Sequence, residues 1–295
     1  MLPAVAAAAS PEVVIEQPVS GSSTNNQMLP FSGTSNDTLD GITLTIHEGG
    51  STGPKAQTLN VIAPLFGTWE TAPESPLADG KYTAVAEQTS LGETGSAAVA
   101  FTIDTASPTV TLDQPKTPSN DTTPSFTGSA SDTEAVTVDI YEGTKAEGTV
   151  VSTATATGTG GGWSSGGASP ALSSGTYTAA ATQPSSLGNA AGKSGAVTFT
   201  IDTASPTVTL NQPKTPSNDT TPSFTGSASD TGTVTVKIYG GSSAEGTVLS
   251  TATATGTGGG WSSGGASPAL SSGTYTAVAT QPSSLGNPAG KSSAV

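Results

Sequence analysis

Aspartates recur at matching positions of a repeated sequence and are the candidate ligands for a metal ion. Calcium takes six to eight oxygen ligands from carboxylates and carbonyls, and the candidates to supply them are Asp104, Asp202, Asp132 and Asp230. Asp104 and Asp202 each lie in the segment IDTASPTVTL, which occurs twice at a spacing of 98 residues. No D-x-D-x-D run is present, and aspartate is common in turns because its carboxylate binds nearby backbone. A calcium site and a turn role therefore both stay open.

The other residue types leave little room for catalysis. The chain has no Cys and no Arg, and its one histidine, His47, stands where the related segments have Tyr141 and Tyr239. Disulfides, thiol nucleophiles and zinc–thiolate sites are therefore excluded, and His47 is predicted to be an ordinary strand residue. The glycine-rich GTGGGW segments lack the lysine and the following helix of a phosphate loop. We expect no enzyme activity and no certain cofactor, with Ca²⁺ at the junctions as the one candidate.

The charge balance excludes nucleic-acid binding. The net charge is −14 with only eight basic residues, all of them Lys, whereas nucleic-acid binding needs clustered cations. No apolar run approaches the roughly 18 residues that a membrane-spanning helix needs. The sequence therefore predicts neither a nucleic-acid partner nor a membrane span.

The first ten residues, MLPAVAAAAS, are set apart from the fold. They are small and apolar, and this run of residues ends at Ser10-Pro11. The segment is similar to the tail of a signal peptide with an A-x-A-like cleavage site, but it lacks the basic region of one. Residues 1–10 are interpreted as a leader remnant or a cloning scar.

The rest of the chain consists of three copies of one unit. Residues 107–197 align with residues 205–295 without a gap, and 80 of these 91 positions are identical. The first unit is more distant but keeps its aromatic residues in the same order. A unit of this size is one ordinary domain. The predicted domains are 11–104, 105–202 and 203–295, and the last strand of the third is expected to be truncated because the unit stops at KSSAV.

Apolar residues alternate with polar ones inside each unit. In VTVDIYEG, for example, Val136, Val138 and Ile140 share one face, which is typical of a half-buried antiparallel strand. Strands of the second unit are expected near 108–114, 123–131, 135–142, 149–158, 161–165, 175–183 and 195–202. About seven strands per unit predict an all-β fold of three tandem immunoglobulin-like β-sandwiches. In a row they would form an elongated rod of about 100 Å or more.

Two sets of aromatic residues are predicted to be structural. The spacing L-x-x-G-x-Y is that of a tyrosine corner, in which a tyrosine hydroxyl bonds to upstream backbone, and it is met by Tyr82, Tyr177 and Tyr275. A tryptophan follows the glycine-rich segment of the second and third units and has a counterpart in the first. These core tryptophans are Trp69, Trp163 and Trp261.

The motifs together resemble a known family. The segments TTPSFTGSASDT, GGWSS, ALSSGTYTA and LGNAAGKSGAVTFTIDTASP resemble the bacterial Ig-like domain repeats of large surface adhesins, biofilm-associated proteins and cell-wall proteins. The match covers units two and three throughout and is looser in unit one. The resemblance implies a secreted or cell-surface stalk that projects a binding region, with neighbouring Ig-like repeats as partners. In some related repeats calcium lies between domains, which here would involve Asp104 and Asp202.

Two other functions stay open. Loops at one end of a sandwich could bind a glycan or a host protein, or the domains could decorate a phage structural protein. The near-identity of copies two and three favours a spacer, because a binding site on the loops would favour exposed aromatic residues and variety between copies. The truncated third unit is interpreted as a fragment of a longer array, or as a domain completed by a strand from another chain.

Overall fold

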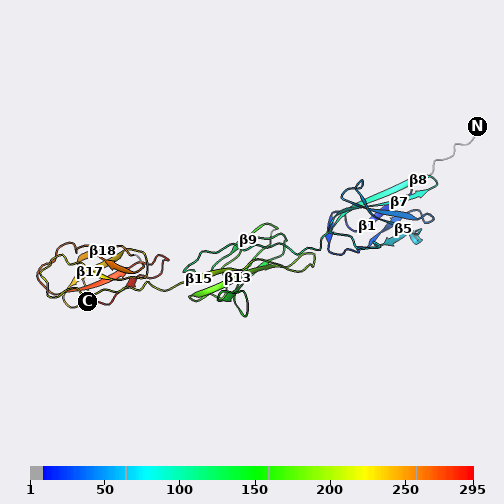
Figure 1. Ribbon diagram of the computed structural model, residues 1–295. Helices are drawn as coiled ribbons and strands as arrows, with labels where there is room; N and C mark the ends of the chain where they lie inside the picture. The colour runs from blue at the N-terminus through cyan, green and yellow to red at the C-terminus, as the bar shows by residue number, and fades with distance from the viewer. Residues whose placement is uncertain (1–8, 64, 159, 257) are drawn as a thin grey trace, which may run out of the picture.

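The computed structural model describes residues 9–295 apart from 64, 159 and 257. Within this part the chain forms β-strands and one 3-10 turn, η1 (Leu65–Gly67), without any α-helix, so none of its helices could cross a membrane. Three sandwiches follow one another in a row (Figure 1). The predicted all-β fold of tandem sandwiches is confirmed. Residues 1–8 of the expected leader lie outside the described residues.

The first sandwich packs a three-stranded sheet on a five-stranded sheet. The smaller sheet has the order β1-β3-β6, with bounds β1 (Val13–Gln17), β3 (Phe31–Ser35) and β6 (Thr68–Thr71). The larger has the order β2-β8-β7-β4-β5, with bounds β2 (Ser22–Thr24), β4 (Ile42–Glu48), β5 (Lys55–Val61), β7 (Gly80–Ser90) and β8 (Glu93–Ile103).

The second and third sandwiches share one plan. In the second, β11-β10-β13-β14 form one sheet in which β15 also pairs with β13, and β12 pairs with β9 in the other. The bounds are β9 (Thr127–Ser129), β10 (Val136–Glu142), β11 (Val150–Ala156), β12 (Gly162–Ser164), β13 (Gly175–Gln183), β14 (Gly192–Lys193) and β15 (Val197–Ile201). The third has β16 (Thr225–Ser227), β17 (Val234–Gly240), β18 (Val248–Ala254), β19 (Gly260–Ser262), β20 (Tyr275–Gln281) and β21 (Gly290–Lys291).

Each sandwich has its own hydrophobic core between its two sheets. The buried members fall within 13–103, 110–201 and 208–279. Val136, Val138 and Ile140 of β10 are fully buried, while Thr137 and Asp139 between them are partly exposed, as the alternation predicts. The three cores lie inside the predicted domains 11–104, 105–202 and 203–295, whose exact boundaries stay a prediction.

Three details differ from the strands that the alternation predicts. The expected strand 123–131 is shortened to β9 (Thr127–Ser129). The expected strand 108–114 is reduced to an isolated bridge between Val110 and Ala130. The cause is local, because the amide of Ser129 donates to the Oγ1 of Thr111, at 2.8 Å, instead of to a backbone carbonyl. In addition, the strands are not all antiparallel, since β2 runs parallel to β8 with Ser22 opposite Phe101.

The predicted structural aromatics are buried in the cores, except Tyr275, which is partly buried against the third core. Trp69, Trp163 and Trp261 are 4–5% exposed. Each of the three tyrosine hydroxyls donates to the carbonyl oxygen four residues upstream, the arrangement of a tyrosine corner. The pairs are Tyr82 with Ala78 at 2.9 Å, Tyr177 with Ser173 at 3.0 Å and Tyr275 with Ser271 at 2.8 Å.

Each core tryptophan packs against a glycine on the facing strand. In the second sandwich Trp163 lies opposite Gly128 in the β9–β12 pair, and a Cβ on Gly128 would lie 2.7 Å from the Cζ2 atom of Trp163. The same close approach occurs at Gly33 and Gly226. At Gly128 the added Cβ would also clash with the carbonyl oxygen of Thr111, so both the neighbouring backbone and the tryptophan would have to move.

We expect Gly128→Ala to lower the free energy of unfolding of the second sandwich by roughly 1–3 kcal/mol, the usual cost of overpacking a core. Guanidinium unfolding of the full chain measures the change. The matched control is Gly195→Ala in the same sandwich, because a Cβ at Gly195 has no atom within 4 Å. Equal destabilisation by the two variants would contradict the steric explanation.

Candidate functional site

Each junction between sandwiches begins where the last strand of one sandwich ends. Asp104 follows β8, and Asp202 follows β15. The amide of Asp104 donates to the carbonyl oxygen of Thr24 at 2.9 Å, and the amide of Asp202 donates to that of Ser119 at 2.8 Å. The start of each junction is therefore tied to the sandwich that it leaves.

A loop of the following sandwich binds the same segment from the other side. The Nδ2 atom of Asn189 donates to the carbonyl oxygens of Asp104, at 3.0 Å, and Ala106, at 2.8 Å. Asn287 makes the same two bonds at the second junction, to Asp202 and Ala204, both at 2.9 Å. One side-chain amide has two donor hydrogens, so a single residue joins both carbonyls. We call Asn189 and Asn287 the junction asparagines.

The junction aspartates shape the segment that the asparagines bind. The Oδ1 atom of Asp104 accepts the amide of Ala106 at 3.0 Å, and the Oδ1 atom of Asp202 accepts the amide of Ala204 at 2.9 Å. This is the local side-chain bond of an Asx turn. It fixes the backbone between the two carbonyls that each junction asparagine binds.

A second pair of aspartates orders the loops that carry the junction asparagines. The Oδ2 atom of Asp132 accepts the amide of Ser186 at 2.9 Å and its hydroxyl at 3.0 Å. In the third sandwich Asp230 accepts the same two donors from Ser284, at 2.8 and 3.0 Å. Ser186 lies three residues before Asn189, so its contact with Asp132 fixes the start of the loop that carries Asn189.

A buried glutamine supports each of these aspartate turns. Gln183 is fully buried, and its Nε2 atom donates to the carbonyl oxygens of Asp132, at 2.8 Å, and Glu134, at 2.7 Å. Gln281 makes the equivalent bonds to Asp230, at 2.6 Å, and Gly232, at 2.8 Å. A buried side-chain amide without partners is costly, so the turn carbonyls satisfy the buried glutamines, which in turn hold the shape of the turns.

The junction loops turn sharply through a glycine next to the preceding sandwich. Gly188 has a φ of +80°, and a Cβ there would lie 3.6 Å from the Nδ2 atom of Asn25 in the first sandwich. Gly286 has a φ of +85°, and its Cβ would lie 3.5 Å from the Nδ2 atom of Asn120. Glycine reaches this left-handed backbone without strain, which lets the loop approach the neighbouring sandwich.

The outer end of the first sandwich has a different loop. The strands β7 and β8 join directly through Leu91 and Gly92, and the pair Ser90–Glu93 closes the hairpin. The buried glutamine is kept as Gln88, which donates to the carbonyl oxygen of Asp40 at 2.7 Å. In the sequence LGETG a glutamate, Glu93, takes the place of the junction asparagine.

Solved structures of tandem repeats are similar to this chain at low identity. The crystal structure of a tetra-tandem repeat in the extending region of a large adhesion protein is 22% identical, with a TM-score of 0.37; the match covers 98% of this chain and 73% of that one. An I-band fragment of titin is 14% identical, with a TM-score of 0.38; the match covers 97% of this chain and 96% of that one. No curated protein matches the chain.

A sequence model of the bacterial Ig-like domain family matches residues 115–203 and 212–295, which together make more than half of the chain. The chain belongs to the bacterial Ig-like domain family. Its second and third sandwiches are thus consecutive bacterial Ig-like repeats, and the resemblance read from the sequence is confirmed. The loops that carry the junction asparagines, and both buried glutamines, lie within the matched ranges.

The four aspartates predicted for calcium all belong to the two junctions of these Ig-like repeats. They are already engaged by hydrogen-bond donors, since Asp132 accepts from Thr133 at 2.6 Å as well as from Ser186. Among the described residues no group of three or more acidic, His or Cys side chains could hold a metal. This donor set does not fit a preformed calcium site. Calcium binding stays a prediction, which an unchanged melting temperature on adding a chelator would exclude.

The sequence patterns did not single out the junction asparagines or the buried glutamines. Asn189 lies 85 residues after the carbonyl that it binds at Asp104, so no local pattern connects them. The available signal was the LGN segment of the family resemblance, which contains Asn189 and Asn287. Gln183 and Gln281 lie two residues after the buried Ala181 and Ala279, on the inward-facing side of their strands, so a polar residue at an inward position was the available signal.

One segment has the spacing of a serine nucleophile. Residues 162–166 read GWSSG, which fits the G-x-S-x-G pattern of a nucleophile elbow. That elbow needs a sharp turn from a strand into a helix, whereas Ser164 is exposed within β12 and Ser165 bonds to the amide of Phe126 at 2.8 Å. Ser164 and Ser165 are therefore structural residues of the sandwich and not nucleophiles.

The donors around the turn aspartates lower their pKa. The backbone amide of Ser186 is the largest cause of the lowering of the Asp132 pKa below its ordinary value of 3.8, and partial burial opposes it. The backbone amide of Ser284 does the same for the pKa of Asp230. A carboxyl group whose folded pKa is lowered contributes stability above its unfolded pKa and loses it as the pH falls through the folded pKa.

We expect the double variant Asp132→Asn, Asp230→Asn to melt at a lower temperature than wild type at neutral pH, with a difference that shrinks over roughly pH 4 to pH 2. An asparagine has one acceptor oxygen where the carboxylate has two, so position 132 could not accept from both Thr133 and Ser186, and position 230 would lose the equivalent bond. Protonation of the wild-type carboxyl groups removes the same advantage. Thermal melts across this range measure the difference. Asp139→Asn is the control, since the third repeat has Lys237 there. A difference that stays constant with pH would contradict this explanation.

Proposed function

We propose that this chain is a non-enzymatic extracellular stalk, in which bacterial Ig-like repeats hold a binding region away from a bacterial surface. The observation that carries the proposal is the clamp made by the junction asparagines. The same side chain binds the same two carbonyls at both junctions, with all four distances between 2.8 and 3.0 Å. A repeated fixed junction is what a spacer requires, because free hinges would let the sandwiches fold back on one another.

The chemistry of the clamp suits a stalk exposed to variable surroundings. The bonds join a neutral amide to backbone carbonyls, so salt does not screen them as it screens ion pairs. The acceptors are main-chain atoms, so any repeat that ends in the same backbone conformation can be joined. The proposed partners are therefore further Ig-like repeats of a longer array, and the proposed location is the cell surface.

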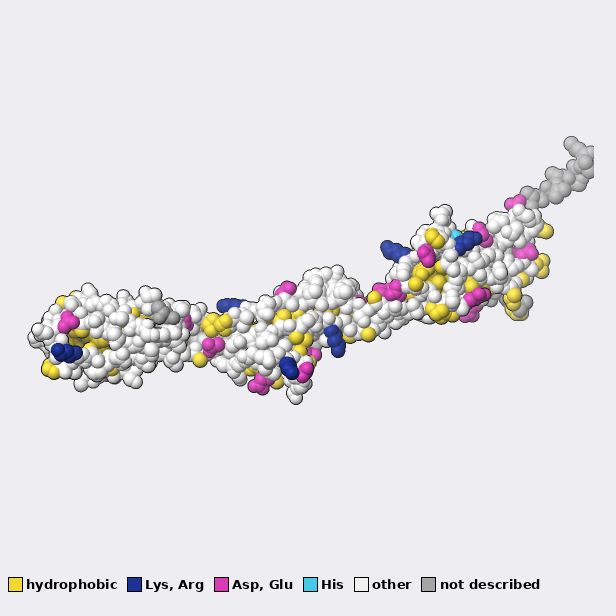
Figure 2. All heavy atoms as spheres, viewed as in Figure 1, with side chains coloured by type: hydrophobic (Ala, Val, Ile, Leu, Met, Phe, Trp, Pro, Cys, Tyr) yellow, Lys and Arg dark blue, Asp and Glu magenta, His cyan; other side chains and the backbone are white. Residues whose placement is uncertain are grey.

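A second candidate function, binding through loops, is favoured by the outer end of the first sandwich. Four apolar side chains in its connections are 83–100% exposed, namely Leu39, Ile62, Phe66 and Leu91. The connections lie at one end because Ile42, at the start of β4, pairs with both Val61 and Gln88. Apolar side chains are visible at this end in Figure 2. We call these four residues the apolar tip.

The backbone of the apolar tip is strained at two of its residues. Phe66 has a φ of 60° and Leu91 a φ of 50°, and among the described residues they are the non-glycine positions with positive φ. The second sandwich has Gly160, with a φ of 63°, at the same distance before its tryptophan. Strained bulky residues persist where function retains them. The charged residues in these connections, Asp37, Asp40 and Glu93, are acidic, which suits an apolar partner surface bordered by basic residues.

To test the stalk, we expect Asn189→Ala with Asn287→Ala to broaden the distribution of angles between sandwiches and to shorten the mean length of the particle in X-ray scattering. Each variant removes two hydrogen bonds that hold a junction together by about 1–3 kcal/mol in total. The melting temperature should change little, because the three cores are untouched.

The control for this experiment is Asn211→Ala, which removes a side-chain bond to Thr225 of 3.0 Å inside the third sandwich. It should leave the scattering curve unchanged. Scattering curves that coincide for wild type and the double variant would rule out the clamp as the source of stiffness.

To test the apolar tip, we expect Phe66→Asn with Leu91→Asn to weaken binding to immobilised glycans or matrix proteins at least about tenfold, without lowering the melting temperature. Asparagine tolerates the left-handed backbone better than phenylalanine or leucine, so the fold should be kept. Val19→Asn, at a side chain that is 61% exposed outside the tip, is the control. If wild type binds no member of the panel, the second candidate is abandoned and the stalk remains.

A further inference from the structure

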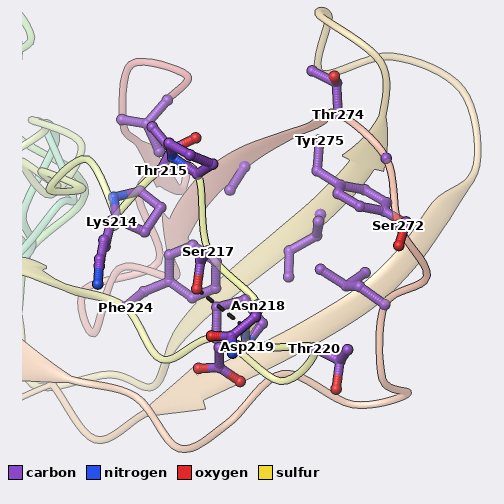
Figure 3. Close-up of a pocket in the computed structure, with 18 of the residues that line it drawn as sticks. Lys214, Thr215, Ser217, Asn218, Asp219, Thr220, Phe224, Ser272, Thr274 and Tyr275 are labelled. Carbon is purple, nitrogen blue, oxygen red and sulfur yellow. Dashed lines mark hydrogen bonds between the residues drawn. The ribbon is translucent and has the colours of Figure 1, made fainter.

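The third sandwich contains a hollow of about 420 Å³ beside β20. Figure 3 shows Phe224 and Tyr275 among the residues that line it. In the second sandwich the equivalent rings, of Phe126 and Tyr177, have their centroids 5.7 and 5.9 Å from that of Phe199 in β15. The hollow in the third sandwich is therefore core space of the sandwich, and we infer no ligand for it.

A second hollow lies on the small sheet of the first sandwich. It has a volume of about 370 Å³, and the residues that line it are Glu12, Val14, Thr34, Ser35 and Asn36. Val14 pairs with Thr34, and both side chains face outward because the next pair, Val13 with Ser35, is buried. Ligand sites in proteins have volumes of about 300–1,000 Å³, so the hollow suits a small ligand. We call it the β1–β3 hollow.

The second and third sandwiches have only Ser and Thr at the corresponding positions. In the order Glu12, Val14, Thr34 and Asn36, these are Thr109, Thr111, Ser129 and Ser131 in the second sandwich and Thr207, Thr209, Ser227 and Ser229 in the third. The hydroxyls of Thr111 and Ser129 bond to each other at 2.8 Å, and the amide of Thr109 donates to the Oγ atom of Ser131 at 2.9 Å. The third sandwich repeats both bonds, at 2.7 and 2.9 Å. These hydroxyls are therefore engaged within each sandwich.

The first sandwich leaves the corresponding polar groups available. Val14 has no hydroxyl to offer Thr34, and among the described residues neither the hydroxyl of Thr34 nor the carboxylate of Glu12 has a hydrogen-bond partner. The Oδ1 atom of Asn36 accepts the amide of Glu12 at 2.8 Å, which leaves both hydrogens of its Nδ2 atom available. An acceptor, a donor and a hydroxyl that can do either thus line one hollow.

The surroundings of the β1–β3 hollow are acidic. Residues 11–104 contain eleven Asp and Glu but only two Lys, Lys55 and Lys81. Both lysines belong to the other end of the sandwich, since Lys55 pairs with His47 late in β4 and Lys81 pairs with Thr102 next to the junction. The field of these carboxylates repels an anionic ligand and tolerates a neutral polar one.

The β1–β3 hollow borders the apolar tip. A Cβ on Gly67 would lie 3.1 Å from the carbonyl oxygen of Ser35, and the fully exposed Phe66 directly precedes Gly67. Small-molecule sites combine apolar and aromatic side chains with a few polar groups that fix the orientation of the ligand. This combination suits a ligand that has both hydroxyl groups and apolar C–H faces.

We propose that the β1–β3 hollow binds a neutral sugar unit of a glycan. The hydroxyl groups of a sugar both donate and accept, so adjacent hydroxyls can donate to the Glu12 carboxylate and accept from Asn36, while Thr34 serves in either role. Val14 contacts the C–H groups of the ring. The inference rests on the second candidate function, binding at the outer end of the first sandwich, and names the class of its ligand.

The test is a titration of the isotope-labelled full chain, followed by its amide chemical shifts in NMR spectra. The probes are the methyl glycosides of galactose, mannose and glucose. We expect at least one of them to shift the amides of residues 12–14 and 34–36 with a Kd of about 1–10 mM. The amides of residues 109–111 and 129–131 are the internal control and should not shift. N-acetylneuraminic acid, which is anionic, should bind at least about tenfold more weakly than that sugar.

The triple variant Glu12→Thr, Val14→Thr, Asn36→Ser gives the first sandwich the residues of the second. It should fold, because the other sandwiches carry these residues at the same positions, and it should weaken sugar binding at least about tenfold. Glu16→Thr is the matched control, since Glu16 is an exposed carboxylate on β1 that does not line the hollow. It should leave the binding of the sugar unchanged.

Four outcomes would overturn the proposal. They are equal shifts in the triple variant, equal shifts at the control amides of the second sandwich, no shift by any of the three sugars up to about 50 mM, and tighter binding of L-lysine amide, which would show that the site recognises a cation. A chain that binds a matrix protein through the apolar tip but no sugar would keep the second candidate function and lose this ligand. The stalk is tested separately, by the scattering of the junction variants.

Discussion

The pairing of the last strand of a sandwich closes its core and also places the carbonyl that the next sandwich binds. In the second sandwich β15 seals the core with Phe199 and Ile201, each 1% exposed. Its end at Asp202 then presents the carbonyl that Asn287 of the next sandwich binds at 2.9 Å. Closure of one domain and attachment of the next therefore use a single strand. A sandwich whose last strand is loose would expose part of its core and would no longer present the carbonyl that the next sandwich binds.

Much of the fold could be predicted from the sequence, because the alternation of apolar and polar residues is a local signal. The expected strand 175–183 has the bounds of β13, and β10 differs from its expected range by one residue. The prediction failed at 108–114, where the hydroxyl of Thr111 replaces a backbone acceptor. The alternation of residues reports which side chains are buried. It cannot show that a side-chain hydroxyl replaces a backbone carbonyl as the acceptor of a hydrogen bond between strands.

The junction was only half predictable. The repeat drew attention to Asp104 and Asp202, and their place after a last strand was read from the sequence. Their partners could not be read in the same way, because a contact across 85 residues depends on how two complete sandwiches meet. The apolar tip was missed for a related reason. Exposure of Phe66 follows from the orientation of its loop, and a single apolar residue in a loop carries no pattern.

The parallel pairing of β2 with β8 has a consequence for a chain that is pulled at both ends. Tension from the N-terminal side would reach β1 first and then β2, and tension from the other side would reach the end of β8, where Thr24 lies opposite Ile103. Two parallel neighbours pulled in opposite directions are loaded in shear, so their hydrogen bonds resist together and cannot be opened one after another. The same holds for the parallel bridge between Ser119 and Ile201. These two short parallel pairings would carry the load in shear, and unfolding of a sandwich under force would require their hydrogen bonds to break.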